Sequence, residues 1–305
     1  MISEVNDYGF CLGTAMWAWT VNEKAAKNLL DLWYENGFRC VDTASNYPIN
    51  KKAEDFRKAE QWLSQWLIST GVQDLKVMIK VGSIDNSGSP ENRLNPSFLS
   101  IAHQHYCDLF SEQFDCLMIH WDNRDDSSEI QDSILAMQAL CKDRQKLGFS
   151  GIKHPTAYKE SLSALEEKPF LQAKHNPFQS HLDYYQSILP YCQPICYGLS
   201  GGGIKLHADY QNDSSANQRN VKINEMEGHI QKIRRLIDDF HREQADVKIE
   251  NMHQLGMLNA ALDDRVSGLL IGPSKTEQLE DAIDFLNRIH QHKDLFLSLK
   301  NSLDD

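Results

Sequence analysis

The chain lacks the features that mark several classes of protein. Seven cysteines are present, an odd number without a Cys-x-x-Cys pair, which disfavours a disulfide framework or a zinc cluster and predicts reduced thiols. No apolar run approaches the roughly 18 residues of a membrane span, so a membrane partner is not expected. The first residues, MISEVNDYGF, lack a basic region followed by an apolar stretch. We therefore expect a cytoplasmic protein.

Positive charge is also scarce. The chain carries 31 Lys and Arg against 43 Asp and Glu, a net charge of -12, which makes nucleic acid an unexpected partner. Hydrophobic residues make up 41% and charged residues 24% of the 305 residues, as in ordinary folded proteins. This length suits one α/β barrel of about 250 residues plus insertions. We expect one domain over residues 1–305, and the sequence indicates no oligomeric state.

Short apolar runs alternate with long amphipathic stretches along the chain. This alternation predicts βα units around a parallel sheet, and eight such units favour a closed (β/α)8 barrel, the TIM barrel, over an open sheet. The expected strands are Phe10–Ala15, Arg39–Asp42, Leu75–Val81, Asp115–His120, Gly148–Ile152, Phe170–Lys174, Pro194–Leu199 and Ser267–Ile271. The expected helices are Glu23–Asn36, Glu54–Ile68, Pro96–Phe110, Ile130–Lys146, Ala157–Glu166, Leu182–Tyr191, Asn224–Asp263 with a break near Ala245, and Thr276–His290.

Two segments are too polar and turn-rich to form barrel walls. They are 83–96 and 201–220, and each follows an expected strand. In a barrel, such segments lie over the mouth at the C-terminal strand ends. Each is either a solvated loop or a lid, and for 201–220 we hypothesise a lid.

Four side chains stand at the C-terminal ends of three successive strands. Asp42 ends the second strand and Tyr47 follows it, while Lys80 and His120 end the third and fourth. Each has an ordinary structural interpretation: a turn cap, a loop-packing residue, a lysine at the wet end of a strand and a satisfied core histidine. Because active sites of these barrels are assembled from strand ends, their coincidence favours a catalytic site.

The chemistry of these four residues suggests a role for each. Lys80, held by Asp42, stabilises a tyrosinate, which lowers the pKa of Tyr47 from about 10 toward working pH. Tyr47 can then act as a general acid, and His120 can donate a hydrogen bond that orients a carbonyl oxygen. Two alternatives stay open: a Schiff-base lyase or aldolase with Lys80 as the nucleophile, and a non-catalytic nucleotide-binding regulatory barrel.

With these residues in place, the sequence resembles the aldo-keto reductase family. The similarity extends over ordered blocks along nearly the whole chain. The resemblance implies a TIM barrel that reduces an aldehyde or ketone, such as a sugar or sugar derivative, or oxidises the corresponding alcohol with NAD(P)H. The blocks are LGTAMWAW (12–19), GFRCVDTASNY (37–47), Lys80 in VMIKVG, His120 in CLMIHW, QAKHNPF (172–178), CYGLSGGG (196–203) and LLIGPSKTEQLEDA (269–282).

The resemblance also implies where cofactor and substrate bind. Ser150 and Gln172 are expected to hydrogen-bond the nicotinamide carboxamide, and Tyr197 to stack on the ring. Trp17 and Trp121 match positions of the substrate pocket. The remaining expected cofactor contacts are Gly198, Leu199, Gly201, Gly272, Ser274, Lys275, Gln278 and Asp281.

NADP(H) is expected over NAD(H), because Ser274 and Lys275 lie at an expected helix N-terminus that suits a 2'-phosphate. Gln278 stands where many NADPH-specific relatives have arginine. No metal site is expected, since His103 and His105 lie two apart in a helical stretch and do not share a face.

The chain departs from the family pattern at several places. Gly151 follows Ser150 where asparagine is usual, and Ala282 replaces the final asparagine of the adenine-side block. The run Tyr197-Gly198-Leu199-Ser200 stands for the common YSPL. The customary N-terminal hairpin below the barrel is expected to be truncated, because about nine residues precede the first strand.

Overall fold

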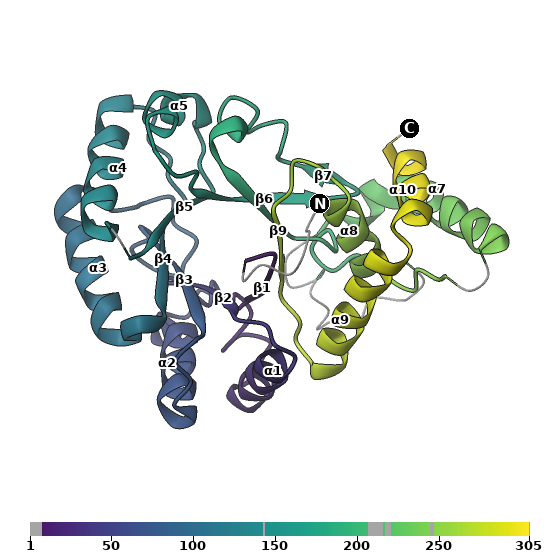
Figure 1. The fold of residues 1–305 in the computed structure, drawn as a ribbon, viewed down its shortest axis with the longest axis horizontal. Coiled ribbons are helices and arrows are strands. Elements are labelled where there is room, and N and C mark those ends of the chain that lie inside the picture. The colour runs from purple at the N-terminus through teal and green to yellow at the C-terminus, as the bar shows by residue number, and fades with distance from the viewer. Residues whose placement is uncertain (1–7, 143, 207–215, 217–220, 245–246, 305) are drawn as a thin grey trace.

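Eight parallel strands form a closed barrel in the computed structural model, which describes residues 8–142, 144–206, 216, 221–244 and 247–304. The strand order is β5-β4-β3-β2-β1-β9-β8-β6, and pairing of β5 with β6 closes the ring (Figure 1). The TIM-barrel prediction is therefore confirmed. The strands are β1 Phe10–Gly13, β2 Cys40–Ala44, β3 Lys76–Val81, β4 Phe114–His120, β5 Lys146–Ser150, β6 Phe170–Asn176, β8 Gln193–Tyr197 and β9 Gly268–Ile271.

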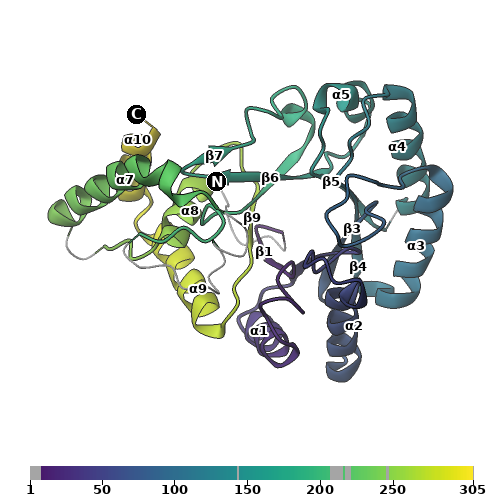
Figure 2. The same ribbon diagram turned by 180° about the vertical axis from the view of Figure 1, so that it is seen from behind.

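Helices surround the barrel, as the views from the front and from behind show (Figures 1 and 2). Their ends are set locally: Asn22, Asn95 and Asn251 each cap a helix through a side-chain oxygen that accepts a backbone N–H. Among the described helices, none is both long and apolar enough to cross a membrane. They are α1 Glu23–Glu35, α2 Lys58–Thr70, α3 Pro96–Phe110, α4 Ser127–Cys141, α5 Pro155–Ser163, α7 Ile223–Glu243, α8 Met252–Ala261, α9 Thr276–Gln291 and α10 Lys293–Asp304.

The chain between β6 and β8 differs from the sequence-based prediction. The helix expected at Leu182–Tyr191 was wrong: only a 3-10 turn, Leu189–Tyr191, forms there, after a short antiparallel strand β7 (Gln179–Ser180). Pro190 lacks a backbone N–H and disfavours the α conformation at the residue before it, which restricts the end of this segment to the 3-10 turn. The helix α10 had not been predicted.

The barrel interior is divided into an apolar floor and a polar mouth. Because side chains alternate along a strand, every second residue faces inward. The floor cluster consists of Cys11, Cys40, Met78, Cys116, Met118, Phe170 and Ile195. Tyr8 covers it from below, with its ring 4.7 Å from that of Phe170 and its hydroxyl donating to Asp115. All seven cysteines are free thiols.

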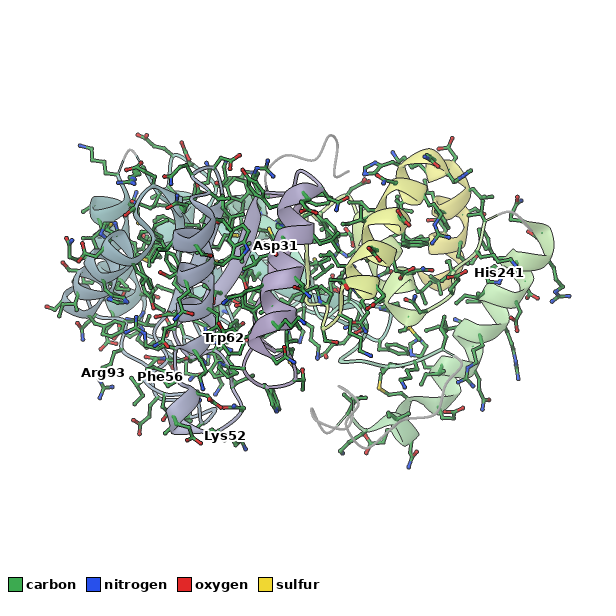
Figure 3. All side chains as sticks on the ribbon, turned by 90° about the horizontal axis from the view of Figure 1, so that it is seen from below. Asp31, Lys52, Phe56, Trp62, Arg93 and His241 are labelled. Atoms are coloured by element: carbon green, nitrogen blue, oxygen red, sulfur yellow. The ribbon has the colours of Figure 1, made fainter. Side chains whose placement is uncertain are left out.

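The loop between β3 and α3 is hydrogen-bonded to the neighbouring loops after β2 and β4. The Asn86 side chain donates to the Lys52 carbonyl at 2.7 Å, and the Asn92 side chain donates to the Trp121 carbonyl at 3.1 Å. Figure 3 shows Lys52 and Phe56, between β2 and α2, and Arg93, between β3 and α3, at one edge of the molecule. Most of the segment 201–220, for which we hypothesised a lid, lies outside the described residues, which there comprise 201–206 and 216.

Candidate active site

A buried ion pair lies at the base of the mouth. Lys80 Nζ donates to Asp42 Oδ2, and each side chain is only 1% exposed. The pleat explains the meeting: Asp42 of β2 pairs with Met78 of β3, and the next inward residue of β3 is Lys80. Neither charge would be tolerated here without the other.

The charge of Lys80 is maintained by its neighbours. Burial favours the neutral amine, but the Asp42 carboxylate and a hydrogen bond with Tyr47 outweigh burial and raise the pKa of Lys80 above its ordinary value. A protonated amine has no lone pair for attack on a carbonyl. The site therefore disfavours the Schiff-base alternative and provides a fixed positive charge beside a phenol.

Tyr47 and His120 complete the arrangement. Tyr47 lies just beyond β2, where its backbone N–H donates to the Ala44 carbonyl at 3.1 Å. Lys80 Nζ is 5.0 Å from the centre of the Tyr47 ring, and the His120 ring lies 6.0 Å from it, nearly perpendicular at 87°. The four residues singled out in the sequence thus come together at one end of the barrel.

His120 is held neutral. Its side chain is 3% exposed, and burial, together with the charge of Lys80, lowers its pKa well below the ordinary value. Its Nδ1 atom is buried and has no hydrogen-bond partner among the described residues. An unpaired buried N–H is rarer than an unpaired acceptor, so the tautomer with the proton on Nε2 is favoured, which makes Nε2 the donor.

Gln172 makes a contact that the sequence did not predict. Its Nε2 atom donates to Asp42 Oδ1 at 2.5 Å, from β6 on the far side of the barrel. Ser150, the other expected carboxamide partner, is buried on β5 and pairs in register with both His120 and Gln172. The two expected carboxamide partners therefore lie at the same level as the catalytic candidates.

The end of β8 is a run of tight turns. Tyr197 is half-buried, and Gly198, Gly201, Gly202 and Gly203 all have positive φ angles, which glycine adopts without strain. Leu199 differs, because its side chain is buried in the outer core, the hydrophobic cluster between the barrel strands and the surrounding helices. Of Leu199, only the backbone is left for a role in cofactor binding.

The start of α9 presents the residues expected on the adenine side. Ser274 and Lys275 precede the helix, and the Gln278 side chain accepts hydrogen bonds from the Ser274 amide and hydroxyl at 2.8 and 3.0 Å. Asp281 accepts from Gln254 and Asn251 at 2.6 and 3.1 Å. Ala282 stands where asparagine is usual in the family pattern. It is wholly buried in the core, so a side chain at this position does not reach the surface around Ser274 and Gln278.

A family model described as the Aldo/keto reductase family matches residues 10–296. The chain belongs to this family. No curated protein matches it individually. Aldo/keto reductases are oxidoreductases that act on carbonyl and alcohol groups with nicotinamide cofactors, and a small-molecule substrate is implied by membership.

The mouth of this aldo/keto reductase fits such a cofactor. Gly272 is exposed at the end of β9, and a Cβ atom there would meet nothing closer than the Gly13 carbonyl oxygen, at 4.0 Å. The end of β9 thus leaves open space at Gly272, close to the α9 N-terminus, which attracts anions. Among the described residues, no group of three or more His, Cys, Asp or Glu is placed to hold a metal ion.

The two expected pocket tryptophans have different surroundings. Trp17 is 0% exposed in the outer core, and its Nε1 atom has no partner among the described residues. Trp121 is half-buried with a φ of +57°, and its ring lies 4.8 Å from that of His120. Of these two tryptophans, only Trp121 is partly exposed, and it lies beside the catalytic candidate His120.

Gly151 explains the position of Trp121. A Cβ atom at Gly151 would lie 2.6 Å from Trp121 Cδ1, and the φ of Gly151 is +72°. Neither the usual asparagine nor any other side chain fits there without displacing the indole. The departure from the family pattern therefore makes room for Trp121.

Proposed function

We propose that this aldo/keto reductase reduces an aldehyde or ketone, or oxidises the corresponding alcohol, with Tyr47 as proton donor and NADP(H) as the preferred cofactor. The observation that carries the proposal is the buried Asp42–Lys80 ion pair, hydrogen-bonded to Tyr47 beside a neutral His120. On this proposal the domain extends over residues 1–305.

In the proposed reaction the protein handles the proton and the carbonyl oxygen. His120 Nε2–H and the Tyr47 hydroxyl donate to that oxygen, which fixes the carbonyl carbon relative to the cofactor. Tyr47 gives up its proton as negative charge develops on the oxygen, and Lys80 stabilises the resulting phenolate. The nicotinamide, when bound, supplies the hydride.

The assignment of cofactor and substrate contacts extends the proposal. Ser150 and Gln172 would hold the carboxamide, Tyr197 would stack on the ring, and the turns from Gly198 to Gly203 would let the backbone approach the pyrophosphate. Ser274 and Lys275 would bind a 2'-phosphate at the α9 N-terminus. Trp121 would face the substrate. The remaining expected contacts are Leu199, through its backbone, Gly272, Gln278 and Asp281.

The first experiment identifies the substrate class. Purified protein is mixed with NADPH or NADH and a panel of aldehydes, ketoses and aldoses, and cofactor oxidation is followed by absorbance. We expect turnover of at least one carbonyl class, with a lower KM for NADPH. Tight cofactor binding without turnover across the panel would instead favour a regulatory nucleotide-binding barrel.

A further inference from the structure

We propose that Gln172 is a positioning residue: it holds the Asp42 carboxylate so that Asp42 fixes Lys80, and it thereby connects the cofactor side of the mouth to the proton donor Tyr47. The inference rests on the proposed function. It assigns Gln172 a task toward the protein itself, in addition to the carboxamide contact that the family resemblance implies.

The hydrogen bonds of Asp42 support this assignment. Lys80 takes Oδ2, and Gln172 Nε2 takes Oδ1 at 2.5 Å. The Asp42 and Lys80 side chains are 1% exposed and Gln172 is 2% exposed, so no bulk water replaces a lost partner. An ionised carboxylate only accepts, which settles that the amide nitrogen of Gln172 faces it.

The bond spans the barrel. β2 and β6 are separated by β3, β4 and β5 on one side and by β1, β9 and β8 on the other. Gln172 therefore reaches Asp42 from the opposite wall rather than from a neighbouring strand. The carboxylate is held between Lys80 on one side and the far wall on the other, and its orientation is fixed from two directions.

The amide of Gln172 has hydrogen-bonding capacity for a second partner. Nε2 carries two protons, of which one serves Asp42 and the other faces Met118 Sδ, a weak acceptor at 3.6 Å, and Oε1 is an acceptor. A primary carboxamide such as that of nicotinamide offers the complementary donor and acceptor. One side chain can thus contact the cofactor and Asp42 at once, which makes the orientation of Asp42 sensitive to how the cofactor sits.

The charged and titratable groups around Asp42 determine the effect of losing this bond. They are Lys80 on β3, Tyr47 beyond β2, His120 on β4, and the thiols of Cys40 and Cys116. Without Gln172, Oδ1 has no hydrogen-bond partner among the described residues, and the carboxylate draws the Lys80 proton more strongly toward itself. Tyr47 then experiences less positive charge, and its phenolate forms only at higher pH.

Alcohol oxidation tests this, because it needs the phenolate. Gln172→Met keeps the length of the side chain and removes the hydrogen bond. We expect the midpoint of the kcat–pH profile to rise by about one pH unit, the equivalent of a tenfold loss of phenolate at a given pH below that midpoint. Ser150→Ala is the matched control: it removes the other expected carboxamide partner from the same level of the barrel, and should raise the cofactor KM without moving the profile. Equal profiles for Gln172→Met and Ser150→Ala would overturn the inference.

A second measurement does not depend on turnover. In cofactor-free protein, Gln172→Met should lower the thermal unfolding midpoint by about 2 to 4 °C, and much less when Asp42→Asn is already present, since contacting residues are not additive. Additive effects overturn the inference. A non-additive result in a protein that turns over no carbonyl upholds the Gln172–Asp42 bond and refutes the proposed function instead.

Should Asp42→Asn fail to fold, Gln172→Glu replaces it. A glutamate can donate to Asp42 only when protonated, so its pKa in the folded state must lie above its unfolded value. Its stabilising contribution is then lost as pH rises through the folded pKa. We expect the unfolding midpoint of this variant to fall more with rising pH than that of the parent; parallel curves would overturn the inference.

Discussion

Replacing Tyr47 by phenylalanine tests the proposed mechanism most directly. The change removes one oxygen and keeps the ring, which is half-buried and packs against the outer core. Its neighbours stay in place, because Lys80 keeps its ion pair with Asp42 and His120 keeps its packing against Trp121. The free energy of unfolding should therefore change by less than about 1 kcal/mol.

The effect on the reaction should be far larger than the effect on the fold. General acid catalysis contributes on the order of 10²-fold or more, and 10²-fold corresponds to about 2.7 kcal/mol of activation free energy. We expect kcat for carbonyl reduction to fall by at least this factor. The loss falls on kcat because the proton is transferred only in the transition state.

The assay follows cofactor oxidation with the best carbonyl substrate of the parent. Cofactor affinity, measured by quenching of tryptophan fluorescence, serves as the control and should stay within about twofold of the parent. A Tyr47→Phe variant that folds, binds cofactor and turns over at nearly the parental rate would refute the proton-donor role of Tyr47.

Four further changes test other parts of the site and fold. Lys80→Met should lower kcat by about 10²-fold, measured by steady-state kinetics. It should also destabilise the fold by about 3 to 5 kcal/mol, measured by denaturant unfolding, because it leaves the buried Asp42 carboxylate unpaired. A stable, active variant contradicts the ion-pair argument. Gly151→Asn should displace Trp121, which lies 2.6 Å from the new Cβ, and so raise the substrate KM at least tenfold while cofactor affinity changes little; an unchanged KM removes Trp121 from the substrate pocket. Lys275→Glu should weaken NADPH at least tenfold more than NADH by titration calorimetry, and equal losses contradict the 2'-phosphate assignment. Burial between α2 and α3 raises the pKa of Glu60 in the folded protein to about 7, above its ordinary value of 4.5. The free energy of unfolding should therefore decrease as pH rises from about 4.5 to about 7. In unfolding measured across this pH range, Glu60→Gln should show a smaller decrease.

Much of the barrel and its catalytic candidates could be predicted because they depend on local pattern. Short apolar runs between long amphipathic stretches identified the strands, and Asp42, Lys80 and His120 stood out because each lies at or near the C-terminal end of an expected strand. In the parallel barrel all strand ends meet at one mouth, so position along the chain is enough to bring these residues together. The helix expected at Leu182–Tyr191 was wrong, because the chain first forms a hairpin of β6 with β7 and Pro190 restricts the end of the segment to a 3-10 turn.

Other features depend on distance in space rather than on spacing in the chain, and only the tertiary structure decided them. The bond from Gln172 to Asp42 joins residues 130 positions apart, and no pattern in either strand indicates it. The burial of Trp17 could not be judged from its sequence block, because burial depends on the packing around it. The sequence shows Gly151 only as a departure from the family pattern, whereas in the structure its missing side chain leaves room for Trp121. The sequence by itself determined the alternation of strands and helices and the kinds of chemistry at the strand ends. Which side chains face one another across the barrel was decided by its closure, since a hydrogen bond or a clash exists only between atoms that the fold brings within a few ångströms.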